Sequence, residues 1–198
     1  MKVRSVAAWL LAAAPPLMAQ GTADSLHLGN DCRLAAQILK KGQPDPHRDW
    51  ALERIASCNE SGGEVLAALW ATPPAQPELG RLGHSSAAFL DARLLTAVRS
   101  AAADRSNPSA VRVAALAVLA AYVDPHVSPT PADLKPPSEG QIAQPIGSVD
   151  HRVQTVGAQP LPEGYAAEIV AFLAGLAGDS DTTVRYAAAR LHDRLTPG

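Results

Sequence analysis

Apolar residues recur every three or four positions along most of the chain after residue 31, with polar residues between them. This spacing places the apolar side chains on one face of a helix, and it is typical of amphipathic helices that pack against one another. Prolines and glycines separate the periodic stretches. The pattern predicts helices over 32–41, 44–58, 61–70, 86–104, 107–122, 163–178 and 182–195, with a short helical turn at 77–83.

The composition favours the same fold class. The chain has 198 residues, which suits one domain, and 47% of them are hydrophobic while only 4% are aromatic. Alanines let helices approach closely, whereas strands favour branched and aromatic residues. We therefore expect an all-α domain over residues 31–196, with Trp50 and Trp70 in its core because both lie at helical positions.

Residues 124–162 break the helical pattern. The segment contains eight of the 17 prolines of the chain and none of its aromatic residues. Proline at this density prevents a continuous helix, so we expect a Pro-rich irregular insertion loop with short strands near 148–156. Loops of this length are usually functional or disordered, and the sequence leaves both alternatives open.

Two of the predicted helices share a sequence pattern. Val111-Arg112 in one matches Val184-Arg185 in the other, and each pair is followed by two alanines and a further apolar residue. The two valines lie 73 positions apart, and without the 39-residue loop the separation is 34. This is the length of about one helix–turn–helix repeat of roughly 34 residues, which indicates an internal repeat.

At these residues the chain resembles the HEAT-repeat family, including its compact bacterial variants, in which an Asp-bearing turn leads into a helix that begins with Val-Arg. Asp179 and Asp181 match that turn, whereas Asn107 replaces the second aspartate in the earlier repeat. The resemblance implies a short α-solenoid of stacked antiparallel helical hairpins. It also implies a protein-binding scaffold, although some bacterial relatives act as lyases on pigment-carrying proteins.

The acidic turn predicts how the last helix begins. Asp181 or Thr182 can cap the helix by accepting hydrogen bonds from its first N–H groups. Asp179 lies in the preceding turn, near the positive end of the helix. Arg185 is expected to reach an acidic turn in its own repeat or in a neighbouring one.

The earlier repeat is expected to begin in the same way. Asn107 is a good N-cap, and Pro108 fits the first helical position, where its missing N–H costs nothing. We interpret Arg112 and Arg185 as structural residues that join turns to helices. Anion binding by these arginines is the alternative.

The N-terminus predicts export. Lys2 and Arg4 precede an apolar stretch that ends in small residues, which is the order of a secretory signal peptide over residues 1–19, with cleavage after Ala19. Residues 20–30 would then form a linker. A transmembrane anchor is the rival interpretation, but about fourteen residues with two prolines cannot span ~30 Å of hydrocarbon.

Charge argues against two classes of partner. Without residues 1–19 the chain has 15 Lys+Arg against 19 Asp+Glu, and its largest basic cluster is the pair Lys40-Lys41. Nucleic-acid binders and polybasic membrane surfaces have clustered basic residues. We therefore expect neither nucleic acid nor a stable membrane anchor as a partner.

Cys32 and Cys58 are the two cysteines of the chain. In an oxidising compartment an even number of cysteines favours a disulfide, and here only one intramolecular pairing exists. The predicted helices place both cysteines at the same end of an antiparallel pair. Two buried thiols are the alternative.

Gly83-His84-Ser85-Ser86-Ala87 resembles the nucleophile elbow of serine hydrolases. That elbow needs a strand before the serine and a parallel sheet beneath it, and no such sheet is predicted. Ser85 or Ser86 is better interpreted as the cap of a helix that starts near Ala87.

Three histidine-containing stretches are candidate metal sites. Asp45, His47 and Asp49 alternate along a turn and a helix start, where acidic residues are favoured anyway. Asp124 with His126 and Asp150 with His151 lie in or beside the Pro-rich loop and could share a site. No HExxH or comparable ligand spacing occurs, so we expect no metal and no cofactor.

These patterns favour a secreted or periplasmic, non-enzymatic module that binds or scaffolds another protein. An enzyme is the runner-up, either lyase-like by family resemblance or a hydrolase that uses Ser85. A structural or assembly factor of the cell envelope is a third possibility.

Overall fold

Helices dominate the structure, which is a computed structural model that describes residues 18–42, 45–150 and 152–196. The prediction of an all-α protein is confirmed for these residues. The predicted signal peptide lies outside them, apart from Met18 and Ala19. The elements are α1 (Met18–Lys40), α2 (Arg48–Ile55), α3 (Gly62–Ala71), α4 (Glu78–Ala87), β1 (Phe89–Leu90), α5 (Ala92–Ala103), α6 (Ser109–Val123), β2 (Thr155–Val156), α7 (Tyr165–Gly175), the 3-10 turn η1 (Leu176–Gly178) and α8 (Thr182–Leu195).

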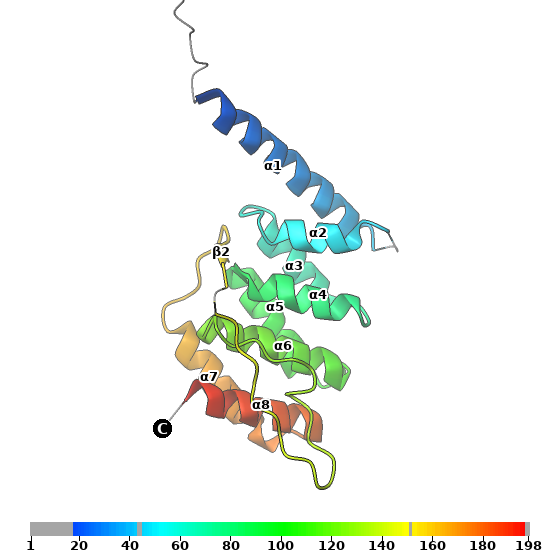
Figure 1. The fold of residues 1–198 in the computed structure, drawn as a ribbon, viewed down its shortest axis with the longest axis vertical. Coiled ribbons are helices and arrows are strands. Elements are labelled where there is room, and N and C mark those ends of the chain that lie inside the picture. The colour runs from blue at the N-terminus through cyan, green and yellow to red at the C-terminus, as the bar shows by residue number, and fades with distance from the viewer. Residues whose placement is uncertain (1–17, 43–44, 151, 197–198) are drawn as a thin grey trace, which may run out of the picture.

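The helices lie in successive layers, from α1 at one end to α7 and α8 at the other (Figure 1). α1 packs on α2, α3 on α5, and α5 on α6. α6 also contacts α4 on one side and α8 on the other, so it lies at the centre of the packing. Among the described residues, none of the helices has the length and apolar character needed to cross a bilayer.

One apolar core runs through all of these layers. Its members include Leu52 and Ile55 from α2, Leu116 from α6 and Leu191 from α8, each with no exposed surface. Burying a side chain of this size stabilises the fold by about 1.5–3 kcal/mol. Trp70 is buried as expected, and Trp50 is half-buried against the same core.

The helix predicted over 86–104 is interrupted. Residues 78–87 form α4, and the chain is then extended through β1 to Asp91, whose carboxylate caps α5 by accepting a hydrogen bond from the amide of Arg93. Ser85 and Ser86 therefore lie in the last turn of α4 and cap no helix. The apolar run Phe89-Leu90 fits the periodic pattern, so the pattern alone did not reveal the break.

α1 begins earlier than the sequence suggests. Residues 20–30, expected as a linker, belong to this helix in the structure. No proline interrupts residues 18–40, so every peptide group there retains the donor that a helix requires. Helix α1 ends before Gly42, whose φ of 64° is the left-handed conformation that favours glycine.

The predicted disulfide is present and joins α1 to the residues that follow α2. Cys32 and Cys58 are bonded, with their Cα atoms 5.7 Å apart. A link that closes a loop of this size stabilises a fold by roughly 3 kcal/mol in the chain-entropy model.

Residues 124–164, called the connection below, run from α6 back along the helices before α7 begins (Figure 1). β2 pairs with β1 in parallel, with Phe89 opposite Thr155, and an antiparallel bridge joins Val127 to Ser148. Strand pairing near 148–156 was expected. The side chain of Gln154 also donates to the carbonyl groups of Ala87 and Ala121, at 3.2 and 3.3 Å.

A buried carboxylate fastens the end of the connection. Asp91 has no exposed surface, and it accepts hydrogen bonds from Arg93 and from the amide of Gln159 at 3.2 Å. Burial raises the pKa of Asp91, but these hydrogen bonds outweigh burial and leave the pKa below its ordinary value. A Cβ at Gly63 would lie 2.3 Å from the Asp91 carboxyl group, and a Cβ at Gly157 would lie 2.5 Å from it. Only glycine therefore fits at these two positions.

Candidate functional site

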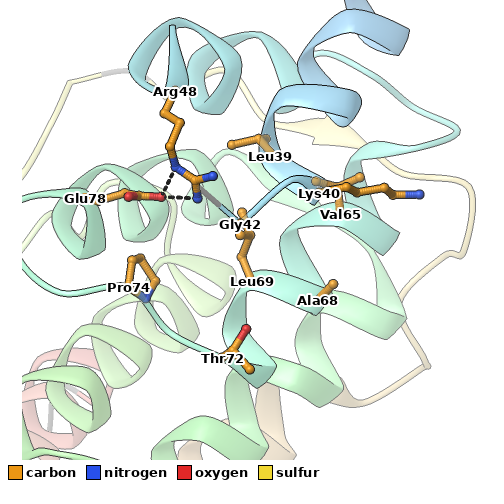
Figure 2. A pocket seen from close by; sticks show the side chains of 10 residues that line it. All are labelled: Leu39, Lys40, Gly42, Arg48, Val65, Ala68, Leu69, Thr72, Pro74 and Glu78. Atoms are coloured by element: carbon orange, nitrogen blue, oxygen red, sulfur yellow. Dashed lines mark hydrogen bonds and ion pairs between the residues drawn. The ribbon is translucent and has the colours of Figure 1, made fainter. Parts of the chain in front are cut away.

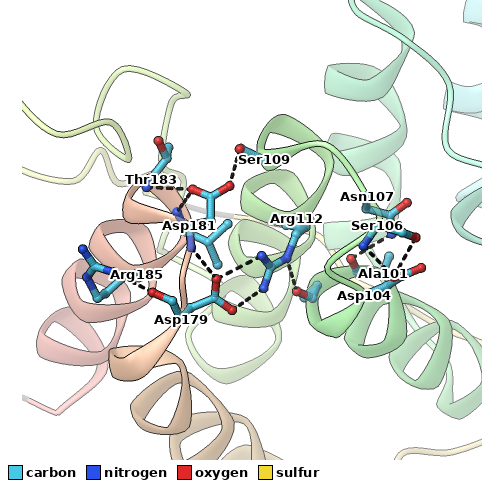
Figure 3. A network of polar contacts seen from close by, with 12 residues as sticks. Ala101, Asp104, Ser106, Asn107, Ser109, Arg112, Asp179, Asp181, Thr183 and Arg185 are labelled. Atoms are coloured by element: carbon cyan, nitrogen blue, oxygen red, sulfur yellow. Dashed lines mark hydrogen bonds and ion pairs between the residues drawn. The ribbon is translucent and has the colours of Figure 1, made fainter.

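A buried ion pair joins the start of α6 to the turn before α8, the two segments that share a sequence pattern (Figure 3). Arg112, in the first turn of α6, donates from Nη1 and Nη2 to the two carboxylate oxygens of Asp179, at 3.1 and 2.6 Å. Its Nε donates to the carbonyl oxygen of Ala102 at 2.9 Å. Both charged side chains are 2% exposed, so the pair is shielded from water.

This geometry determines the ionisation of Asp179. The hydrogen bonds from Arg112 lower the pKa of Asp179 to about 2, against an ordinary value of 3.8. The amide of Asp181 donates a further hydrogen bond to the same carboxylate at 2.9 Å. Asp179 is therefore a charged acceptor at neutral pH, and the buried charge of Arg112 is paired with it.

Asp181 forms a second link between α6 and the start of α8. One oxygen caps α8 by accepting hydrogen bonds from the amides of Thr183 and Val184, at 2.8 and 3.1 Å. The other accepts a hydrogen bond from the hydroxyl of Ser109, the first residue of α6. Arg185 donates to the carbonyl oxygen of Asp179 in its own turn, at 2.6 Å.

The start of α6 differs from the sequence prediction. Pro108 occupies the cap position with φ −56° and ψ 146°, and α6 begins one residue later at Ser109. Asn107 instead donates from its side chain to the carbonyl oxygen of Ala101, near the end of α5, at 3.1 Å. The extended ψ of Pro108 leaves it outside the helix, so Asn107 lies one residue too early to cap α6.

The residues before Ser85 do not form the nucleophile elbow. Ser85 is 3% exposed inside α4, where the elbow requires a strand before the serine. β1 follows the serine instead of preceding it. Ser86 accepts a hydrogen bond from Nε1 of Trp70 at 2.9 Å, which is a packing role.

The candidate metal ligands serve as turn and surface groups. Asp45 accepts a hydrogen bond from the amide of His47, and Asp49 forms an ion pair with Arg81 at 2.9 Å. Asp124 likewise accepts from the amide of His126, at 2.9 Å.

No group of three or more His, Cys, Asp and Glu side chains able to hold a metal occurs within residues 18–42, 45–150 and 152–196. The other candidate pair is Asp150 with His151, and His151 lies outside those residues.

The pockets formed by the described residues include two of ligand size. The first has a volume of about 600 Å³ and lies among the end of α1, the start of α2, α3 and the start of α4 (Figure 2). Its basic side chains are paired with carboxylates: Arg48 with Glu78 at 2.5 Å and Lys40 with Glu64 at 3.0 Å. The charge of this pocket is therefore balanced.

The second pocket, called the α4–α6 pocket, has a volume of about 720 Å³. Leu79 of α4 and Val113 and Val118 of α6 line its helical side, and Val127 and Leu134 of the connection line it as well. The sequence did not predict it, because its walls come from segments far apart in the chain.

The fold and these contacts define an all-α protein of layered helices, fastened by one disulfide and one buried ion pair. The chain matches no protein-family model, no curated protein and no solved structure.

Proposed function

We propose that this chain is an exported, non-enzymatic module of HEAT-like repeats that binds another protein. The Arg112–Asp179 pair supports the repeat assignment, because the Val-Arg start of one helix binds the acidic turn that precedes the next. The helix pairs α5–α6 and α7–α8 each pack together, and α6 contacts α8 between them. This is the arrangement expected when each hairpin buries its apolar side against its neighbour.

The observation that carries the proposal is the exposure of aliphatic side chains on an anchored connection. Ile142, Val153 and Val156 are 87%, 72% and 59% exposed, although hydrogen bonds hold neighbouring residues against the helices. A loop of this length that is held in place is usually functional. Exposed apolar groups on such a loop are suited to contact a protein surface.

Export is supported by the disulfide, since such bonds form and persist in oxidising compartments. The charged and apolar order of residues 1–19 is consistent with the same compartment.

Site-specific photo-cross-linking in the cells that produce the protein would test the proposal. A photoreactive amino acid placed at Ile142 or Val153 should capture the same partner protein, and one placed at the exposed Glu53 of α2 should not. The double variant Ile142→Ser/Val153→Ser should reduce the amount of partner that copurifies with the chain by about tenfold, since contact energies of about 1.4 kcal/mol change affinity tenfold. Equal capture at all three positions, or no capture at any, would refute the proposal.

A further inference from the structure

The α4–α6 pocket has the size and lining of a small-molecule site. Its volume of about 720 Å³ falls within the usual range of roughly 300–1,000 Å³ for such sites. Val127 and Leu134, which also line it, are 0% and 1% exposed and belong to the apolar core, so the connection is packed firmly there. Ala114 and Ala117 of α6 also line it, and their small side chains leave room for a ligand.

The charged side chains that line this pocket are both basic. They are Lys135 and Arg152, and no aspartate or glutamate is among the lining residues. In the first pocket, by contrast, each basic side chain has a carboxylate partner. The α4–α6 pocket thus has apolar walls and a positive, unbalanced charge, which complements an anion with an apolar body.

Arg152 lines this pocket and is partly buried. Its Nη2 donates to the hydroxyl of Ser128 at 3.2 Å, and its Nη1 is buried with no hydrogen-bond partner among the residues that the structure describes. Burial lowers the pKa of the Arg152 guanidinium, because water is removed without a counter-charge. A buried charge is costly unless it is paired, so an anion in the adjoining pocket would stabilise it.

The connection wall is not suited to bind a peptide as an added strand. The amide of Ser128 donates to Gly147 and the amide of Thr130 to Asp133, at 3.0 and 2.7 Å. Pro129 and Pro131 have no N–H group. The backbone N–H groups of this part of the connection are either already hydrogen-bonded or absent. It can therefore contact a ligand only through apolar groups, and the polar contact must come from the basic side chains.

We infer that the α4–α6 pocket binds a small amphipathic carboxylate. The apolar body of the ligand lies against the helical side of the pocket, and its carboxylate pairs with Arg152. This site is additional to the protein-binding surface proposed above and does not depend on it.

Fluorescence titration of the purified, disulfide-bonded chain would test the inference. The probe is 11-(dansylamino)undecanoic acid, and its primary amide is the uncharged control. The acid should bind at least about tenfold more tightly than the amide, since hydrogen bonds to a charged group contribute about 1.5–3 kcal/mol. Equal affinities for acid and amide, or no binding of either, would overturn the inference.

Variants locate the site and its charge. Ala114→Phe should fill the pocket and abolish binding, and Ala117→Leu is a milder filling variant for use if circular dichroism shows that the first one unfolds. Arg152→Gln should remove the preference for acid over amide. Arg105→Gln is the matched control, because Arg105 is exposed in the turn between α5 and α6, outside the pocket. Binding that survives both filling variants, or a preference that survives Arg152→Gln, would place the probe elsewhere and refute the assignment.

Discussion

The two ends of the helical stack are fastened by different chemistry. At the N-terminal end, a covalent bond between Cys32 and Cys58 joins α1 to the residues that follow α2. Toward the C-terminal end, the buried pair Arg112–Asp179 joins α6 to the turn before α8. The first link responds to reductant and not to acid, and the second responds to acid and not to reductant. The stability of each end can therefore be perturbed separately.

Breaking the ion pair is expected to have the largest effect. Arg112→Met leaves the carboxylate of Asp179 buried without its partner, which should lower the free energy of unfolding by about 3–5 kcal/mol in urea denaturation. The double variant Arg112→Met/Asp179→Asn should recover part of this loss, because asparagine keeps an acceptor for the amide of Asp181 without a charge.

The matched control is Arg99→Met, which removes an exposed ion pair with Glu168 and should cost within about 1 kcal/mol. A similar cost for Arg112→Met and Arg99→Met would show that the buried pair contributes no more than a surface pair.

Removal of the disulfide should have the next largest effect. Cys32→Ser/Cys58→Ser should lower the free energy of unfolding by roughly 3 kcal/mol, through the greater chain entropy of the unfolded state. Reduction of the wild-type protein should have the same effect, and the serine variant should be insensitive to reductant. A wild-type protein whose unfolding midpoint does not move on reduction would contradict this expectation.

Acid should destabilise the C-terminal end of the stack, where Asp179 lies. The pKa of Asp179 is about 2 in the folded state against 3.8 ordinarily, so its contribution is complete above pH 3.8 and is lost as the pH falls through 2. A shift of this size corresponds to about 2 kcal/mol. Unfolding measured between pH 5 and pH 2 should show this loss in the wild type and a smaller one in Arg112→Met. Identical pH profiles would assign the acid sensitivity to other groups.

The smallest effect is expected at the second link between α6 and the start of α8. Ser109→Ala removes one hydrogen bond to Asp181 while the cap of α8 stays intact, so thermal denaturation should show a loss of about 1 kcal/mol. Ser106→Ala, which removes an exposed hydrogen bond to Asp104, should cost less than about 0.5 kcal/mol. A larger loss in Ser106→Ala than in Ser109→Ala would be inconsistent with a joining role for Ser109.

The helical class could be predicted from the local spacing of apolar residues, and the disulfide from the presence of two cysteines. A motif of a few residues singled out Arg112 and Asp179. The break at Phe89-Leu90 was missed although Asp91 is a good cap residue, since the apolar period continues across it. The α4–α6 pocket and the contacts that hold the connection against the helices could not be predicted from the sequence. The side chain of Gln154 and the backbone amide of Gln159 bind groups more than thirty positions away, and nothing in the neighbouring sequence indicates these contacts.

The pairing of β2 with β1 also affects how the molecule unfolds. After α6 the chain returns to a strand that precedes α5, and only then starts α7. In an array where each layer touches only the next, the terminal layer can melt alone. Here the C-terminal helices follow β2, and β2 is hydrogen-bonded to β1, the strand between α4 and α5. We therefore expect the layers from α4 to α8 to unfold together as one cooperative unit.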